Sequence, residues 1–168
     1  IKKSSKEFNI EEHHQSAKKI AEETTVLLKN EDNILPISSY KNVAIIGDFA
    51  ETPRYQGAGS SVVNPTKLDN LLTCAKEAGF SITGYAKGYD RTNPTPKAEL
   101  ITEAVAAVEG AEVVLLCVGL DEISESEGLD RMHMRLPQNQ QELIKAVAKA
   151  HKNVVLVISG GSSFEMPE

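Results

Sequence analysis

Acidic side chains gather in one segment of this sequence, and a carboxyl group can donate and accept protons in catalysis. The segment, residues 119–136, contains Asp121, Glu122, Glu125, Glu127 and Asp130. Gly128 frees the backbone directly after Glu127, and an Asp130–Arg131 ion pair would fix the turn while Glu127 points away. In an arbitrary protein a solvated acidic loop is the simpler interpretation. One carboxylate alone does not define a reaction.

Two glycine-rich segments could bind an anion through backbone N–H groups. In residues 55–61, Tyr-Gln-Gly-Ala-Gly-Ser-Ser, no helix opens directly after Gly59 because Pro65 intervenes, and the dinucleotide fingerprint requires that helix. Residues 159–163, Ser-Gly-Gly-Ser-Ser, directly follow a predicted strand and form a better candidate, although no Lys and no helix accompanies them. A phosphate or nucleotide binder therefore stays open as an alternative.

Metal and nucleophile chemistry have little support in the sequence. The histidines lack Cys or Asp neighbours at ligand spacing, so we expect surface side chains at His13, His14, His133 and His151. No Ser occupies a nucleophile elbow. Cys74 and Cys117 lie in apolar stretches, which favours small buried side chains over disulfide partners. We expect no metal and no cofactor.

Strands and helices alternate along most of the chain. Short apolar runs predict strands at residues 43–46, 81–86, 113–118 and 154–158. Helical spacing of apolar residues predicts a first helix from Asn9, as its N-cap, to Asn30, and later helices over 66–78, after Thr95-Pro96, and from Pro137. This alternation predicts an α/β fold with an open, mostly parallel sheet flanked by helices, as in a flavodoxin-like three-layer sandwich.

The connections differ in length at the two ends of the predicted sheet. Each helix returns to the next strand through a tight join, whereas each strand leaves through a long segment: 47–65, 87–94, 119–136, and from 159 onwards. In open α/β sheets ligands bind at the carboxyl ends of the strands. We therefore expect the functional residues in these long segments, including the acidic one.

Composition narrows the class of partner. The 168 residues include 18 Lys+Arg and 24 Asp+Glu, which gives a formal charge of −6 and disfavours a nucleic-acid partner. No apolar run approaches the roughly 20 residues that span a bilayer, so we expect no membrane partner. No signal peptide opens the chain, which predicts a cytoplasmic protein, with secretion open if the natural N-terminus is missing.

Several segments, taken together and in order, resemble one known family. They are AEETTVLLKNEDNILPI (21–37), VAIIGDFA (43–50), RYQGAGSSVVNP (54–65), VGLDEISESEGLDRMHMRLPQNQQELI (118–144) and VLVISGGSSFEMP (155–167). The sequence is similar to the second domain of family 3 glycoside hydrolases, which are β-glucosidases and related exo-acting enzymes. The similarity extends from about residue 17 to the end. Five blocks in the correct order are far more specific than any one of them.

The resemblance implies an active site shared between two domains. In this family a TIM-like barrel supplies an Asp nucleophile, and a loop of the second domain supplies a Glu as general acid/base. Glu127, within Glu-Gly-Leu-Asp-Arg, occupies the matching position, and Glu125 and then Glu122 rank behind it because loop lengths vary. Asp130 and Arg131 match residues that hold the loop. Substrate binding or loop support is implied for residues of the 54–61 segment: Arg54, Tyr55, Gln56 and Ser60.

The barrel is missing from this sequence, and with it the nucleophile. We expect residues 1–37 to form an interdomain linker and connecting helix, and residues 38–168 to form a sandwich domain that is incomplete at its C-terminus. The implied partner is a β-linked glucoside or short oligosaccharide, bound together with the barrel domain. The chain alone should hydrolyse nothing. A stand-alone carbohydrate-binding module is the other alternative, although the chain has no Trp and only 5% aromatic residues.

Overall fold

The structure is a computed structural model that describes residues 8–37 and 41–166. The described residues form two compact units: one contains residues 8–36 and 64–68, and the other contains residues 37, 41–63 and 69–166. The first unit holds helix α1 (Ile10–Thr24) and the 3-10 turn η1 (Glu31–Asn33). The strands and the other helices of the described residues belong to the second unit.

Helix α1 begins where the sequence predicts and ends earlier. The side chain of Asn9 caps the helix by accepting hydrogen bonds from the backbone N–H groups of Glu11 and Glu12, at 3.1 and 3.2 Å. The helix ends at Thr24 rather than near Asn30, because the hydroxyls of Thr24 and Thr25 both donate to the Ala21 carbonyl and Thr25 is already extended. Such side-chain bonds compete with the helical ladder, and β-branched residues propagate a helix poorly.

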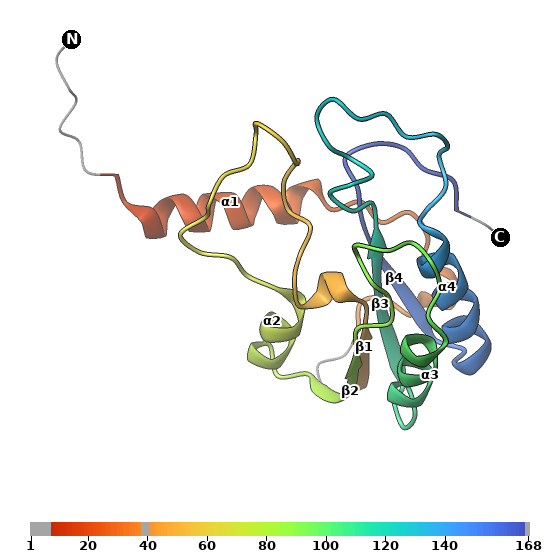
Figure 1. The fold of residues 1–168 in the computed structure, drawn as a ribbon. Coiled ribbons are helices and arrows are strands. Elements are labelled where there is room, and N and C mark those ends of the chain that lie inside the picture. Colours follow the sequence, from red (N-terminus) through yellow and green to blue (C-terminus); the bar gives the residue numbers. More distant parts are fainter. Residues whose placement is uncertain (1–7, 38–40, 167–168) are drawn as a thin grey trace, which may run out of the picture. The chain divides into compact units, whose positions relative to one another are not determined.

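The second unit is the predicted sandwich. Its four strands pair in parallel in the order β2-β1-β3-β4, with bounds Asn42–Ile46 (β1), Ser81–Ala86 (β2), Val113–Gly119 (β3) and Val154–Ser159 (β4). Helix α2 (Leu71–Glu77) covers one face of the sheet, and α3 (Ala98–Ala107) and α4 (Gln138–Ala150) cover the other (Figure 1). The prediction of an α/β fold with an open parallel sheet flanked by helices is therefore confirmed.

Burial follows the position of each strand in the sheet. Every residue of the central strand β3 is buried, and β1 is buried from Val43 to Ile46. Uninterrupted apolar runs are typical of parallel strands that are covered on both faces. The edge strands β2 and β4 are only partly covered, and Val157 in β4 is 38% exposed.

The later helices start at side chains that cap them or bend the chain before them. Helix α2 begins at Leu71, not at residue 66, because the Asn70 side chain accepts the N–H of Thr73 at 2.8 Å. The prediction for α3 is wrong by a few residues: the Thr95 N–H donates to the Asn93 side chain, and the helix starts at Ala98. Short polar side chains favour caps and turns in this way.

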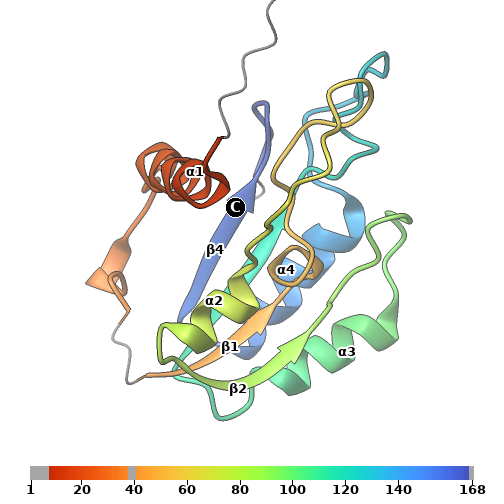
Figure 2. The ribbon, with the colours of Figure 1, turned by 90° about the vertical axis from the view of Figure 1, so that its left-hand side faces the viewer.

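Four loops leave the carboxyl ends of the strands, as the sequence predicts. We call them L1 (51–63), L2 (87–97), L3 (120–136) and L4 (160–166) (Figure 2). Two buried amides at the start of α4 hold the beginning of these loops in place. The side-chain Oε1 of Gln140 accepts the Gly119 N–H at 2.8 Å, and the side-chain amide of Asn139 donates to the backbone carbonyls of Asp90 and Asn93, both at 2.8 Å. The start of L3 and the body of L2 are therefore tied to one helix.

Candidate active site

Loops L1 and L3 run beside each other beyond the end of the sheet (Figure 2). Ala58 in L1 and Ser126 in L3 form an isolated parallel bridge, and the Glu127 N–H donates to the Ala58 carbonyl at 3.4 Å. The backbone N–H of Ser60 donates to Glu127 Oε2 at 2.9 Å, and the Ser60 hydroxyl donates to the same oxygen. Residues from two distant parts of the sequence thus hold one exposed carboxylate.

Glu127 lies in the solvent-exposed part of this arrangement, at the carboxyl ends of the strands. The hydroxyl of Ser60, followed by its backbone N–H, holds the pKa of the Glu127 carboxyl below its usual value, because both donors favour the charged form. In this chain by itself Glu127 is therefore a carboxylate at neutral pH. A general acid needs the opposite shift, which burial or a neighbouring negative charge would provide.

Gly59 permits the close approach of L1 to Glu127. Its φ of +93° belongs to a region that L side chains rarely adopt, and a Cβ built on it would lie 2.7 Å from the Glu127 Cβ. The glycine-rich segment therefore has a definite function in this structure. It brings backbone and hydroxyl donors against a carboxylate of the same chain.

Glu125, two residues before Glu127, is enclosed instead of exposed. Its side chain is only 14% exposed, and it accepts hydrogen bonds from the Gly161 N–H at 3.1 and 2.9 Å and from the Ser162 hydroxyl at 2.6 Å. Arg54 Nη2 lies 3.8 Å from Glu125 Oε2. The two neighbouring acids of L3 therefore have different surroundings and different chemical capabilities.

Arg131 makes its contacts outside its own loop. Its Nη2 donates to the Ser162 hydroxyl at 3.0 Å and to the Ser163 carbonyl at 2.7 Å, both in L4. An Asp130–Arg131 ion pair does not occur among the salt bridges of the described residues, so that expectation is corrected. Arg131 supports L3 by attaching it to L4, because a guanidinium can donate to several acceptors at once.

The remaining predicted residues of L1 have internal partners. The Gln56 amide donates to the Tyr55 hydroxyl at 2.8 Å and to the Val63 carbonyl at 2.9 Å, and it accepts the Val63 N–H at 2.9 Å. These bonds close L1 on itself. Tyr55 is 48% exposed, whereas the Arg54 side chain is 7% exposed and points its Nη2 at the Glu125 carbonyl, 3.4 Å away.

A cluster of charged side chains around Asp48 was not predicted from the sequence. Asp48, directly after β1 and Gly47, is buried and pairs with Arg91 Nε at 2.8 Å and Lys87 Nζ at 3.0 Å. Arg91 also contacts Glu122 at 3.2 Å and lies 4.6 Å above the Phe49 ring. The sequence feature that could have indicated this cluster was Asp48 itself, an acidic residue close to the end of a buried strand. This cluster connects L2 with L3 and gives Glu122 a structural partner.

Replacing Asp48 with alanine should lower the free energy of unfolding by about 2–4 kcal/mol, because it leaves the largely buried Arg91 without its main counter-charge. The matched control is Glu142→Ala, which breaks the exposed Glu142–Lys145 pair on α4 and should cost less than about 1 kcal/mol. Urea unfolding of both variants measures the difference. Equal, small losses would show that the Asp48 cluster contributes no more than a surface pair.

The glycine-rich turn after β4 binds a negatively charged group, but this group is a side chain of the same protein. Gly161 and Ser162, within the 159–163 segment, donate to the Glu125 carboxylate. Because these donors already bind Glu125, the turn no longer supports a phosphate or nucleotide site. Backbone N–H groups in a turn attract negative charge whatever its source.

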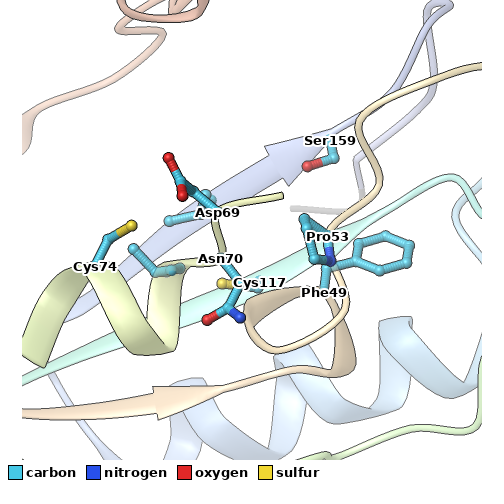
Figure 3. Close-up of a pocket in the computed structure, with 9 residues that line it drawn as sticks. Phe49, Pro53, Asp69, Asn70, Cys74, Cys117 and Ser159 are labelled. Carbon is cyan, nitrogen blue, oxygen red and sulfur yellow. The ribbon is translucent and has the colours of Figure 1, made fainter. Parts of the chain in front are cut away.

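A separate hollow lies beneath α2. It has a volume of about 240 Å³ and is lined mainly by apolar side chains with a few polar ones: Phe49, Pro53, Asp69, Asn70, Leu71, Cys74, Cys117, Val157 and Ser159 (Figure 3). Neither Glu125 nor Glu127 lines it. Both cysteines are free, and burial raises the pKa of the Cys117 thiol to about 12, so that thiol is unreactive at neutral pH.

The histidines are not all surface groups. His151 is half-buried, and its two ring nitrogens lie 3.1 Å from the carbonyls of Asn153 and Ala111, so it connects the end of α4 to the start of β3. Within residues 8–37 and 41–166, no three His, Cys, Asp or Glu side chains are grouped to hold a metal ion. No helix in these same ranges is both long and apolar enough to cross a membrane.

Comparison with known proteins identifies the family. The profile of the "Glycosyl hydrolase family 3 C-terminal domain" matches residues 25–168. Thermostable beta-glucosidase B of Acetivibrio thermocellus is 43% identical over 168 residues, which cover 99% of this chain and 22% of that protein. An exo-alpha-(1->6)-L-arabinopyranosidase of Bifidobacterium breve is 40% identical over 164 residues, covering 92% of this chain and 22% of that protein.

A solved structure agrees with these relatives. The crystal structure of the GH3 beta-glucosidase of Bifidobacterium adolescentis superposes with a TM-score of 0.90 at 41% identity, over 97% of this chain and 24% of that chain. The chain thus spans less than a quarter of the length of the proteins that it matches. It belongs to glycosyl hydrolase family 3, and residues 25–168 match the C-terminal domain of that family.

Proposed function

We propose that this chain is the acid/base-bearing domain of a retaining β-glycosidase, with a β-linked glucoside or short oligosaccharide as substrate. One observation carries the proposal. Glu127, in the Glu-Gly-Leu-Asp-Arg motif, is exposed at the carboxyl ends of the strands, while Glu125 beside it is enclosed by donors of its own chain. Of the two acids, only Glu127 is available to a substrate.

The proposed reaction needs a second carboxylate from another domain. In a retaining glycosidase two carboxyl groups lie about 5–5.5 Å apart: one attacks the anomeric carbon while the other protonates the departing oxygen. The first would be an aspartate of a TIM-like barrel, and Glu127 would be the second. In the next step Glu127, now a carboxylate, would remove a proton from the water that releases the sugar.

The electrostatics of Glu127 explain why a second domain is required. In this chain alone, Ser60 lowers the pKa of Glu127, so the group carries no proton to donate at neutral pH. A barrel that excludes water and places an aspartate nearby would raise that pKa, because both burial and like charge disfavour a second negative charge. Such a pair of carboxyl groups, with pKa values pushed apart, is how glycosidases assign the two roles.

The test compares the chain alone with the complete enzyme, by which we mean this chain joined to a family 3 barrel domain. We expect the complete enzyme to hydrolyse p-nitrophenyl β-glucoside with retention of configuration, and the chain alone to show no turnover above buffer. Turnover by the chain alone would contradict the proposal, and so would inversion of the anomeric centre by the complete enzyme. Nucleotide titration of the chain is the control, and we expect no micromolar binding.

A further inference from the structure

The Glu125 carboxylate lies where three loops meet. It belongs to L3, its oxygens accept the Gly161 N–H and the Ser162 hydroxyl of L4, and Arg54 of L1 lies 3.8 Å from it. The side chains of Arg54 and Glu125 are 7% and 14% exposed. We call this group, with Arg131 and its contacts to L4, the Glu125 clamp.

Ser162 is central to the clamp because its hydroxyl both accepts and donates. Arg131 Nη2 donates to the Ser162 oxygen at 3.0 Å, and the Ser162 hydroxyl donates to Glu125 at 2.6 Å. A hydroxyl has one proton, so the bond from Arg131 directs that proton towards Glu125. These two bonds hold the Ser162 hydroxyl in one orientation.

The clamp makes Glu125 unsuitable for proton transfer. Its two oxygens are occupied by donors, and an ionised carboxylate can only accept hydrogen bonds. Arg54 lies 3.8 Å from the Glu125 carboxylate, and the Ser162 hydroxyl that donates to it is itself held by Arg131. Within the described residues, the carboxylate of the exposed Glu127 has hydrogen bonds from one residue, Ser60, on a loop that needs its own support.

We propose that Glu125 is a positioning residue that joins L1, L3 and L4 and thereby fixes where the Glu127 carboxylate stands. Between the two acids, Ser126 pairs with Ala58 of L1, and L1 also supplies Ser60 to Glu127. Arg54 anchors the beginning of that same loop to Glu125. Loss of the clamp would therefore release both the backbone that carries Glu127 and the loop that orients it. This inference rests on the proposed role of Glu127.

Glu125→Gln in the complete enzyme tests the clamp. We expect kcat for β-glucosides with poor leaving groups, such as cellobiose, to fall on the order of 10- to 100-fold, because small misplacements of a catalytic group cost that much. For 2,4-dinitrophenyl β-glucoside, whose departure needs no proton, we expect kcat/KM, which reports the first step alone, to change by less than about 3-fold. Azide should restore nothing, because the Glu127 carboxylate is still present.

The matched control is Glu165→Gln. Glu165 also joins L4 to L3, through Arg135, but this ion pair is 3.7 Å long with both side chains more than half exposed. We expect the control to keep the kcat of the parent enzyme on both substrates. Ser162→Ala is a milder second variant that removes one donor. The decreases in kcat caused by Ser162→Ala and by Glu125→Gln should not be additive in the double variant, because both residues belong to one hydrogen-bond network.

These experiments distinguish failure of the proposal for Glu125 from failure of the proposal for Glu127. Equal losses on both substrates, or no loss for Glu125→Gln and Ser162→Ala, would overturn the clamp and leave the assignment of Glu127 intact. Rescue of Glu125→Gln by azide would make Glu125 itself the proton donor and would overturn both proposals. A selective loss without rescue, together with azide rescue of Glu127→Ala, supports both.

Discussion

Glu127→Ala should lower kcat of the complete enzyme on cellobiose by about 10²- to 10⁴-fold, the range that general acid–base catalysis typically contributes. The reason is that the glucose leaving group must be protonated as the glycosidic bond breaks, and in our proposal Glu127 is the donor. Activated aryl glucosides leave without that proton, so the first step on them should be nearly unaffected. Steady-state kinetics on both substrates measures the difference.

Azide gives the prediction a second measurement. With the side chain removed, a small anion can enter the space of Glu127 and attack the glycosyl-enzyme, which needs no general base. Added azide should therefore accelerate turnover of the activated substrate and yield a β-glycosyl azide. Normal cleavage of cellobiose by the variant would show that another residue is the acid/base.

The pH dependence should change in the same variant. Protonated Glu127 is the active form in the first step, so kcat/KM of the parent enzyme should fall as the pH rises through the pKa of this group, and Glu127→Ala should lose that basic limb. In the chain alone the pKa of Glu127 shifts in the opposite direction from the one that a general acid needs. Ser60 lowers this pKa, and a carbon-detected NMR titration should find it below the ordinary value. Ser60→Ala should raise it towards that value.

Gly59→Ala is the second change for which we expect a large effect. The added Cβ would lie 2.7 Å from the Glu127 Cβ and 3.1 Å from its Oε2, so L1 and Glu127 must separate. The positive φ adds a backbone penalty of about 1–2 kcal/mol. We expect kcat on cellobiose to fall by about 10²-fold, with a smaller effect on activated aryl glucosides.

Gly110→Ala is the control for the backbone penalty alone. Gly110 has a φ of +77° at the join between α3 and β3, and nothing lies within 4 Å of a Cβ placed there. This variant should lose a similar amount of stability in urea unfolding and keep its kcat. If both variants lost activity equally, the effect would come from backbone strain and not from contact with Glu127.

Much of the second unit could be predicted from local pattern. Short apolar runs predicted the four described strands, most clearly β1 and β3, because a parallel strand covered on both faces admits few polar residues. The beginnings and ends of the helices were less predictable. Asn70 starts α2, and the hydroxyls of Thr24 and Thr25 mark the end of α1, so single side-chain bonds decided these boundaries.

The candidate site was predictable only in part. The sequence located the acidic segment at the functional edge, and its resemblance to family 3 selected Glu127, a role that stays a prediction. The Asp48 cluster was missed because Arg91 lies far from Asp48 in the chain, and no short motif connects them. The Asp130–Arg131 ion pair was wrong because Arg131 found acceptors in L4, which sequence spacing does not reveal.

The sequence by itself determined the succession of strands and helices along the chain, the family, and the loop that bears the acids. Each of these depends on short stretches of residues that are close together in the chain. Only the tertiary structure decided that Glu125 is enclosed and Glu127 exposed. The two lie in one short polar run, and what separates them is contact with Gly161, 36 residues away, and with Ser60, 67 residues away. Such contacts form only when the sheet brings the carboxyl ends of its strands together.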